Sequence, residues 1–233
     1  MAIKVKSTKQ VIHHVNCMVY GESGIGKTTL CATAPNPLII SIESGLLTLA
    51  EVDVPVIEID TFAELDEVHT WLQKSKEADK YDTICLDSLS ETAELILTEE
   101  MQRNKDGRAA YGVMAETMTY SIRGFRDLPK HTLFTAKVRK IVDDSSGVIR
   151  FYPSVPGQQL LNNLPYFFDE VFRMDFGKTK TKPVQQYRYI DTVGNRQFIC
   201  KDRSGKLSAQ EKPDLTHIFN KILKPTEEVK DGD

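Results

Sequence analysis

Short apolar runs alternate with polar, glycine-containing segments along most of the chain, and this alternation predicts a mixed α/β protein. The first runs are apolar at consecutive positions, which is typical of strands buried on both faces of a parallel sheet. They are VNCMVY (15–20), LIISIESG (38–45), TICL (83–86) and LFTA (133–136). Three later runs also predict strands, with the last two pairing as a C-terminal β-hairpin through the turn DTVGN. These are FFDEVFRM (167–174), VQQYRYI (184–190) and RQFICK (196–201).

Helical periodicity fills the intervals between several of these runs. The segment 61–78 places its apolar residues on one face, and Thr61 with Glu64 forms a capping-box pattern at its start. Segments 88–102 and 212–223 also predict helices. The expected fold is therefore a mostly parallel central sheet flanked by helices, in one domain covering residues 1–223. The polar end, residues 224–233, is expected to be a disordered tail.

Composition narrows the class of protein without naming a function. The 233 residues are 40% hydrophobic and 27% charged, which suits a globular domain with a real core. No apolar run approaches the roughly 20 residues that cross a bilayer, and no signal-peptide core follows the N-terminus. We therefore expect a cytoplasmic protein with no membrane partner. None of the four cysteines forms a CxxC pair, so neither a zinc site nor a redox motif is indicated.

The segment GESGIGKT (21–28) directly follows the first predicted strand and fits the pattern GxxxxGK[ST]. Gly21 and Gly26 permit backbone conformations and close approaches that a Cβ would prevent. Lys27 would reach the β- and γ-phosphates of ATP, and the Thr28 hydroxyl would ligate Mg²⁺. The predicted nucleotide-binding residues, here called the phosphate loop, are Gly21, Glu22, Ser23, Gly24, Ile25, Gly26, Lys27, Thr28 and Thr29.

Two carboxylates end neighbouring apolar strands. Asp87 follows the run TICL and has the position of a Walker B aspartate, which would hold Mg²⁺ through water. Glu43 ends the run LIISIES at the same expected edge of the sheet and could polarise an attacking water. An ordinary strand-end glutamate beside a glycine turn explains Glu43 equally well on spacing alone.

In this order, the phosphate loop, a strand ending in Glu43 and a strand ending in LDS (86–88) resemble the RecA-like ATPases. The resemblance implies that Glu43 activates water. It also implies a polar sensor at the end of the strand in HTLFTAKVRK (131–140), where Thr135 or Lys137 would detect the γ-phosphate. A basic residue that merely ends a strand remains the alternative for Lys137.

The segment FICKDRSGKL (198–207) resembles the K-x-R-x-G finger of DnaB-type helicases and RadA. The resemblance implies that Lys201 and Arg203 reach the γ-phosphate bound by a neighbouring subunit, where an arginine stabilises the developing charge. The chain would then act as a homo-oligomer, either a ring or a filament, with ATP at its interfaces. A basic turn after a strand is the alternative.

Among RecA-like proteins, the chain is most similar to a group of small phage ATPases that lack the flanking domains of RecA. This resemblance covers about residues 12–205. It implies a Mg²⁺-ATP-dependent ATPase in single-strand annealing and recombination, acting in the host cytoplasm. Single-stranded DNA and a single-strand DNA-binding protein are the implied partners.

Charge is distributed unevenly, with 3 Lys/Arg against 16 Asp/Glu in residues 41–100 and 9 against 3 in residues 101–140. RecA-like proteins bind DNA through two loops, which here correspond to 103–112 and to a predicted hairpin at 137–153. Tyr111, Phe151 and Tyr152 could stack on bases. Solvated loop charges are the alternative for each basic residue. The candidate DNA-binding residues are Arg103, Lys105, Arg108, Arg139, Lys140 and Arg150.

Two other functions fit the same core. A small helicase or helicase loader would use ATP to move along DNA, and a nucleotide-dependent switch would bind a protein partner and no DNA. Processive strand separation would indicate the first, and binding insensitive to DNA and salt would indicate the second.

Overall fold

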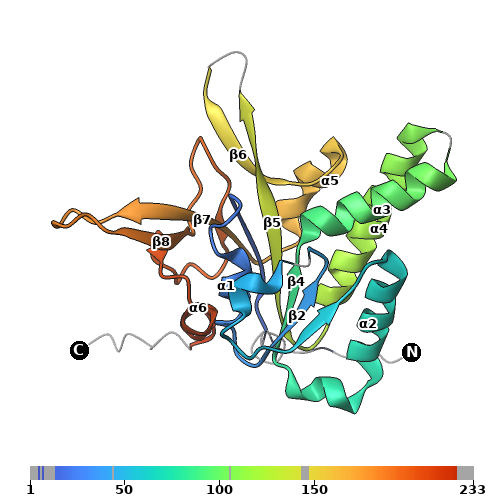
Figure 1. Ribbon diagram of the computed structural model, residues 1–233, viewed down its shortest axis with the longest axis horizontal. Coiled ribbons are helices and arrows are strands. Elements are labelled where there is room, and N and C mark those ends of the chain that lie inside the picture. The colour runs from blue at the N-terminus through green and yellow to red at the C-terminus, as the bar shows by residue number, and fades with distance from the viewer. Residues whose placement is uncertain are drawn as a thin grey trace.

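The computed structural model describes residues 5, 7, 14–43, 45–104, 106–142 and 147–224. A twisted sheet runs through these residues in the order β10-β8-β7-β1-β5-β4-β2-β3, with β6 paired to β5 and β9 paired to β7 (Figure 1). The strands are β1 (Asn16–Gly21), β2 (Pro37–Ser41), β3 (Val56–Glu58), β4 (Thr83–Asp87), β5 (His131–Val142), β6 (Ile149–Ser154), β7 (Glu170–Lys178), β8 (Gln186–Asp191), β9 (Lys201–Asp202) and β10 (Gln210–Glu211).

The central part of this sheet is parallel, as the apolar runs predicted. Strand β1 pairs in parallel with β5 and β7, β4 pairs with β5 and β2, and β2 pairs with β3. The strand that precedes the phosphate loop is thus separated from the strand ending in Asp87 by β5 alone. This is the mostly parallel, helix-flanked arrangement of a RecA-like P-loop protein.

Helices cover both faces of the sheet. Alternate strand residues point to opposite sides, and here both sets are apolar and need a covering layer. Met18 and Tyr20 of β1 join the core beneath α2, α3, α4 and α5, whereas Cys17 and Val19 join the core beneath α1, η2 and α6. The helices are α1 (Lys27–Cys31), η2 (Leu46–Leu49), α2 (Phe62–Lys74), η3 (Lys76–Lys80), α3 (Leu89–Arg103), α4 (Gly107–Arg126), α5 (Gln158–Asn163), η4 (Leu164–Tyr166) and α6 (Leu215–Leu223).

Local signals explain where the helices begin. Thr61 caps α2, and its side chain and that of Glu64 form the predicted capping box. Asp106 caps α4, which begins at Gly107 and runs for 20 residues. The segment 103–112 was predicted to be a loop, but most of it belongs to the C-terminal end of α3 and the N-terminal part of α4.

The β5–β6 hairpin (137–154) rises from the edge of the sheet at which β1 ends, as Figure 1 shows. The strands on both sides of its tip confirm the predicted hairpin, and residues 143–146 lie outside the described residues. The β7–β8 arm (170–191), at the left of Figure 1, is a second antiparallel projection.

The expected pairing of 184–190 with 196–201 is wrong. Strand β8 pairs with β7 along its whole length and with β10 at Ile190 and Asp191, and it has no other strand partner within the described residues. The main chain of 197–199 bonds elsewhere: the Phe151 N–H donates to the Gln197 carbonyl at 2.6 Å, and the Tyr20 hydroxyl bonds both main-chain groups of Ile199. The C-terminal hairpin of this fold is therefore formed by β7 and β8.

Candidate nucleotide-binding site

The phosphate loop leaves β1 at Gly21 and enters α1 at Lys27. Gly24 and Gly26 have φ angles of 74° and 104°, which are strained for a residue with a side chain. A Cβ on Gly21 would lie 2.8 Å from the Met174 carbonyl oxygen, so β7 also requires glycine there. Ile25 is fully buried and anchors the loop in the core, leaving the backbone around it at the surface.

The Lys27 side chain folds back over the loop. Its Nζ donates to the carbonyl oxygens of Gly21 and Glu22, each at 3.0 Å. Burial lowers the pKa of Lys27, and the nearby carboxylates of Glu43 and Asp87 oppose that shift. The cation therefore lies over the loop and is influenced by the two acidic residues that the sequence placed at this edge.

Thr28 and Asp87 are in direct contact. The Thr28 Oγ1 donates to Asp87 Oδ2 at 2.6 Å, and the Thr135 hydroxyl donates to Asp87 Oδ1. Asp87 is buried at the end of β4. A hydroxyl and a carboxylate oxygen side by side at the start of α1 suit Mg²⁺, which takes oxygen ligands and usually few from protein.

Glu43 lies beside this pair. Ser41 of β2 is in register with Asp87 of β4, so the chain beyond each strand emerges at the same edge. The Ser88 hydroxyl donates to Glu43 Oε1 and also accepts from the Glu91 N–H at 3.4 Å, capping α3. The peptide bond between Asp87 and Ser88 is cis. Sequence spacing had not indicated Ser88 as the group that holds Glu43.

The two sensor candidates differ in their contacts. Thr135 bonds directly to Asp87, as described above. Lys137 lies opposite Gly21 across the β5–β1 pair and forms an ion pair with Glu91 of α3. The hydrogen bond that the Lys137 amine donates to Glu91 raises the pKa of Lys137. Both residues thus lie at the edge that carries the phosphate loop, and Lys137 opens the β5–β6 hairpin.

Lys201 and Arg203 lie far from the phosphate loop of the same chain. Strand β9 pairs with Glu170 and Val171, at the start of β7, which is next to Cys17 of β1. Cys17 precedes Gly21 by four residues, or roughly 13 Å of strand. Lys201 donates to the carbonyl oxygens of Pro165 and Phe168.

Arg203 is more accessible than Lys201. Its guanidinium pairs with Asp169 at 2.7 Å, and its side chain is 60% exposed. A contact of this residue with nucleotide therefore requires a neighbouring subunit. Lys201, held by two carbonyl oxygens, stabilises the turn around η4 in its own subunit.

The basic residues of the β5–β6 hairpin are divided between its two faces. Arg139 is opposite Tyr152, and Arg150 is two positions away on the same face. All three are at least partly exposed, and Arg150 and Tyr152 line a pocket of about 190 Å³. Lys140 points to the opposite face, where its amine pairs with Glu22 of the phosphate loop at 2.8 Å.

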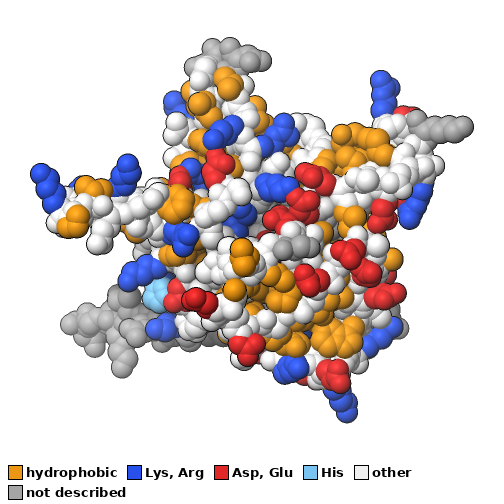
Figure 2. Space-filling model, in the orientation of Figure 1, with side chains coloured by type: hydrophobic (Ala, Val, Ile, Leu, Met, Phe, Trp, Pro, Cys, Tyr) orange, Lys and Arg blue, Asp and Glu red, His pale blue; other side chains and the backbone are white. Residues whose placement is uncertain are grey.

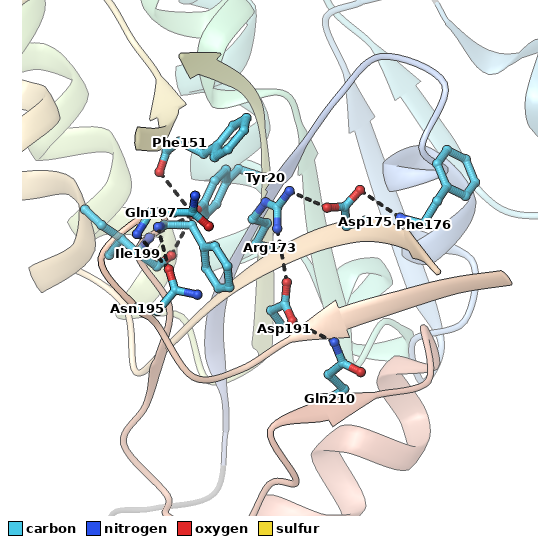
Figure 3. Close-up of polar contacts among 11 residues, drawn as sticks. Tyr20, Phe151, Arg173, Asp175, Phe176, Asp191, Asn195, Gln197, Ile199 and Gln210 are labelled. Atoms are coloured by element: carbon cyan, nitrogen blue, oxygen red, sulfur yellow. Dashed lines mark hydrogen bonds and ion pairs between the residues drawn. The ribbon is translucent and has the colours of Figure 1, made fainter. Parts of the chain in front are cut away.

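A cluster around Arg173 fixes the base of the hairpin (Figure 3). The guanidinium pairs with Asp175 and Asp191, and it lies between the rings of Phe151 and Phe198 at 4.9 and 4.7 Å. The Phe151 ring packs on Arg173 and is only partly exposed, and its stacking on a base stays a prediction.

The first DNA-binding region is built differently from the hairpin. Arg103 ends α3 and pairs with Glu99 and Glu100, so it is partly neutralised. Arg108 is exposed in the first turn of α4. Lys105 lies outside the described residues. Figure 2 shows Lys and Arg around the base of the β5–β6 hairpin and on the β7–β8 arm, with Asp and Glu gathered to the right, toward α2 and α3.

The sheet order, the phosphate loop and the Thr28–Asp87 contact define a P-loop ATPase of RecA-like fold. A family model described as an AAA domain (AAA_24) matches residues 13–204, so the chain belongs to that family. No curated protein matches the sequence. The crystal structure of the KaiC-like protein PH0186 from the hyperthermophilic archaea Pyrococcus horikoshii OT3 is similar, at 13% identity, 76% coverage of this chain, 77% of that chain and a TM-score of 0.44. At that similarity the match says nothing about activity or partners.

Within the described residues, no helix is long and apolar enough to cross a membrane.

Proposed function

We propose that the protein is a Mg²⁺-ATP-dependent ATPase that binds single-stranded DNA and acts in phage recombination and strand annealing. The observation that best supports coupling of ATP hydrolysis to DNA binding is the ion pair between Glu22 of the phosphate loop and Lys140 of the β5–β6 hairpin. The annealing and recombination role rests on the resemblance of the sequence to small phage ATPases.

At the nucleotide site, each residue has a distinct task. Thr28 and Asp87 would hold Mg²⁺, and Lys27 would move from the loop carbonyls onto the phosphates. Glu43, oriented by Ser88, would accept a proton from the attacking water. Bound Mg²⁺-ATP supplies the phosphoryl group, and the metal neutralises its charge.

The hairpin is the proposed site for single-stranded DNA. Arg139 and Arg150 would bind phosphates and Tyr152 would stack on a base, all from the same face. Contacts of this kind are tolerant of sequence and weaken as salt rises. The ion pair between Lys140 and Glu22 would then transmit the state of the nucleotide to the DNA-binding face of the hairpin.

The subunit interface is the proposed place for Arg203. Its exposed guanidinium would complete the site of a neighbour in a ring or filament of identical subunits. Single-strand DNA-binding protein remains a candidate partner that acts on the same DNA.

The test is ATP hydrolysis measured with and without single-stranded DNA at several protein concentrations. DNA stimulation, and a rate per subunit that rises with concentration, would support the DNA-coupled interfacial site. A rate that does not change when DNA is added would overturn the DNA-coupled site and favour the protein-binding switch. Annealing of complementary strands without processive unwinding would then distinguish the proposed role from a helicase.

A further inference from the structure

The side chain of Arg188, on β8, lies directly against the phosphate loop. A methyl group placed on Gly26 would be 3.2 Å from Arg188 Nε and 3.4 Å from both Cδ and Cζ. Three consecutive atoms of the arginine therefore cover Gly26, although 162 residues separate the two positions in the chain. The sequence pattern did not place Arg188 at this site, because it predicted that 184–190 pairs with 196–201 and not with β7.

The β7–β8 register explains how Arg188 reaches the loop. Arg188 pairs with Phe176, and Met174 with Ile190, so all four side chains lie on one face of the arm. Met174 and Ile190 join the same core as Ile25 of the phosphate loop. Arg188 and Phe176 extend that face outward beyond the core, beside the loop.

The described contacts of Arg188 do not neutralise the positive charge of its guanidinium. Its Cζ lies 5.7 Å from the centre of the Phe176 ring, and Phe176 is 40% exposed. Within the described part of the chain, Arg188 forms no ion pair with an acidic side chain. An arginine that packs on an aromatic ring, without a carboxylate, beside a loop built for phosphate is suited to bind an anion.

We propose that Arg188 binds the phosphates of the nucleotide held by the phosphate loop of its own subunit, with Phe176 supporting the guanidinium from behind. This rests on the proposed function. Lys27 would approach the phosphates from the side of Asp87, and Arg188 from the side of the arm. The planar guanidinium can make two parallel hydrogen bonds to phosphate oxygens, which a lysine cannot.

The test is binding of ADP, measured by calorimetry, with competition by inorganic pyrophosphate. R188A should bind ADP and pyrophosphate at least about tenfold more weakly, and R188K should fall between R188A and the unsubstituted protein. The control K178A removes an exposed cation two positions further out on the same face of the arm, and its affinity should stay within about twofold. Thermal unfolding of each variant checks that the fold is intact, and R188Q replaces R188A where that variant unfolds.

Each result decides the question. An affinity within about twofold for both R188A and R188K would overturn the proposal, as would an equal loss in K178A. Loss of ADP binding without loss of pyrophosphate competition would also overturn it, because Arg188 would then contact the nucleoside. If the unsubstituted protein bound neither ligand, or K27A bound both normally, the proposed ATPase site itself would fail.

Discussion

Lys140 and Glu22 join the β5–β6 hairpin to the phosphate loop by an ion pair of 2.8 Å. Their side chains are 57% and 58% exposed, so the pair contributes little stability and can open at small cost. Glu22 also accepts the Lys27 amine through its main-chain carbonyl. A nucleotide that draws Lys27 away from that carbonyl would therefore disturb the residue to which the hairpin is tied.

Charge reversal tests this connection. E22K and K140E should each reduce the stimulation of ATP hydrolysis by single-stranded DNA, because each places like charges together. The double variant E22K/K140E restores an attractive pair and should recover stimulation relative to either single variant. The control is R139E, on the other face of the hairpin, which E22K should not rescue. A double variant as impaired as the single ones would contradict the coupling.

Glu43 is expected to act in hydrolysis and not in binding. E43Q keeps the shape of the side chain and an oxygen for the Ser88 hydroxyl, but it cannot accept a proton. Its single-turnover rate should fall roughly 10²- to 10⁴-fold, the usual contribution of a general base, while ATP affinity changes little. The matched control is E58Q, at the end of β3. If E43Q hydrolysed ATP at the normal rate, Glu43 would be an ordinary strand-end residue.

Subunit mixing tests the role of Arg203. K27A should lack nucleotide binding, and R203A should lack the contribution to its neighbour, so each should be nearly inactive alone. An equal mixture should recover up to about one quarter of the activity, because about that fraction of head-to-tail interfaces joins an intact loop to an intact arginine. No recovery, with R203A fully active by itself, would assign Arg203 to its ion pair with Asp169. K201A should instead lower thermal stability, because Lys201 holds two carbonyl oxygens.

Short-range signals in the sequence predicted most of the sheet and the centre of the site. The phosphate loop, Asp87 and Glu43 are each followed or preceded by an apolar strand, and parallel strands bring their carboxyl ends to one edge. The contacts of Thr28 with Asp87 and of Glu43 with Ser88 follow from that topology.

The sequence-based predictions failed where pairing between distant segments of the chain determines the structure. Strand β8 pairs with β7 and β10, and no local pattern distinguishes those partners from the segment 196–201. Arg188 could not be placed against Gly26 without that register. Likewise, the sequence places Phe151 on a predicted hairpin and gives no sign of a partner for its ring. In the structure that ring packs on Arg173, which comes 22 residues later in the chain.

Glu170 links the stability of the fold to pH. It is buried at the start of β7, and its Oε2 has no hydrogen-bond partner in the described part of the chain. Burial, followed by the charge of Asp202, raises its pKa from 4.5 to about 8. Between those two values the folded protein binds a proton that the unfolded chain releases. The contribution of Glu170 is therefore fully present below pH 4.5 and is lost as pH rises through 8.

The free energy of unfolding should accordingly decline between pH 4.5 and 8, by less than about 5 kcal/mol for the whole shift, and the part of this decline between pH 6.5 and 8 should be less than about 2 kcal/mol. His131 does not complicate this interval, because burial lowers its pKa from 6.5 to about 4 and its contribution is complete above pH 6.5. E170Q cannot ionise, so its stability should change much less with pH over this range, whereas E67Q, on the exposed face of α2, should keep the decline. Urea denaturation at several pH values measures both slopes. Equal slopes in E170Q and the unsubstituted protein would show that Glu170 is ionised in the folded state and that another group causes the decline.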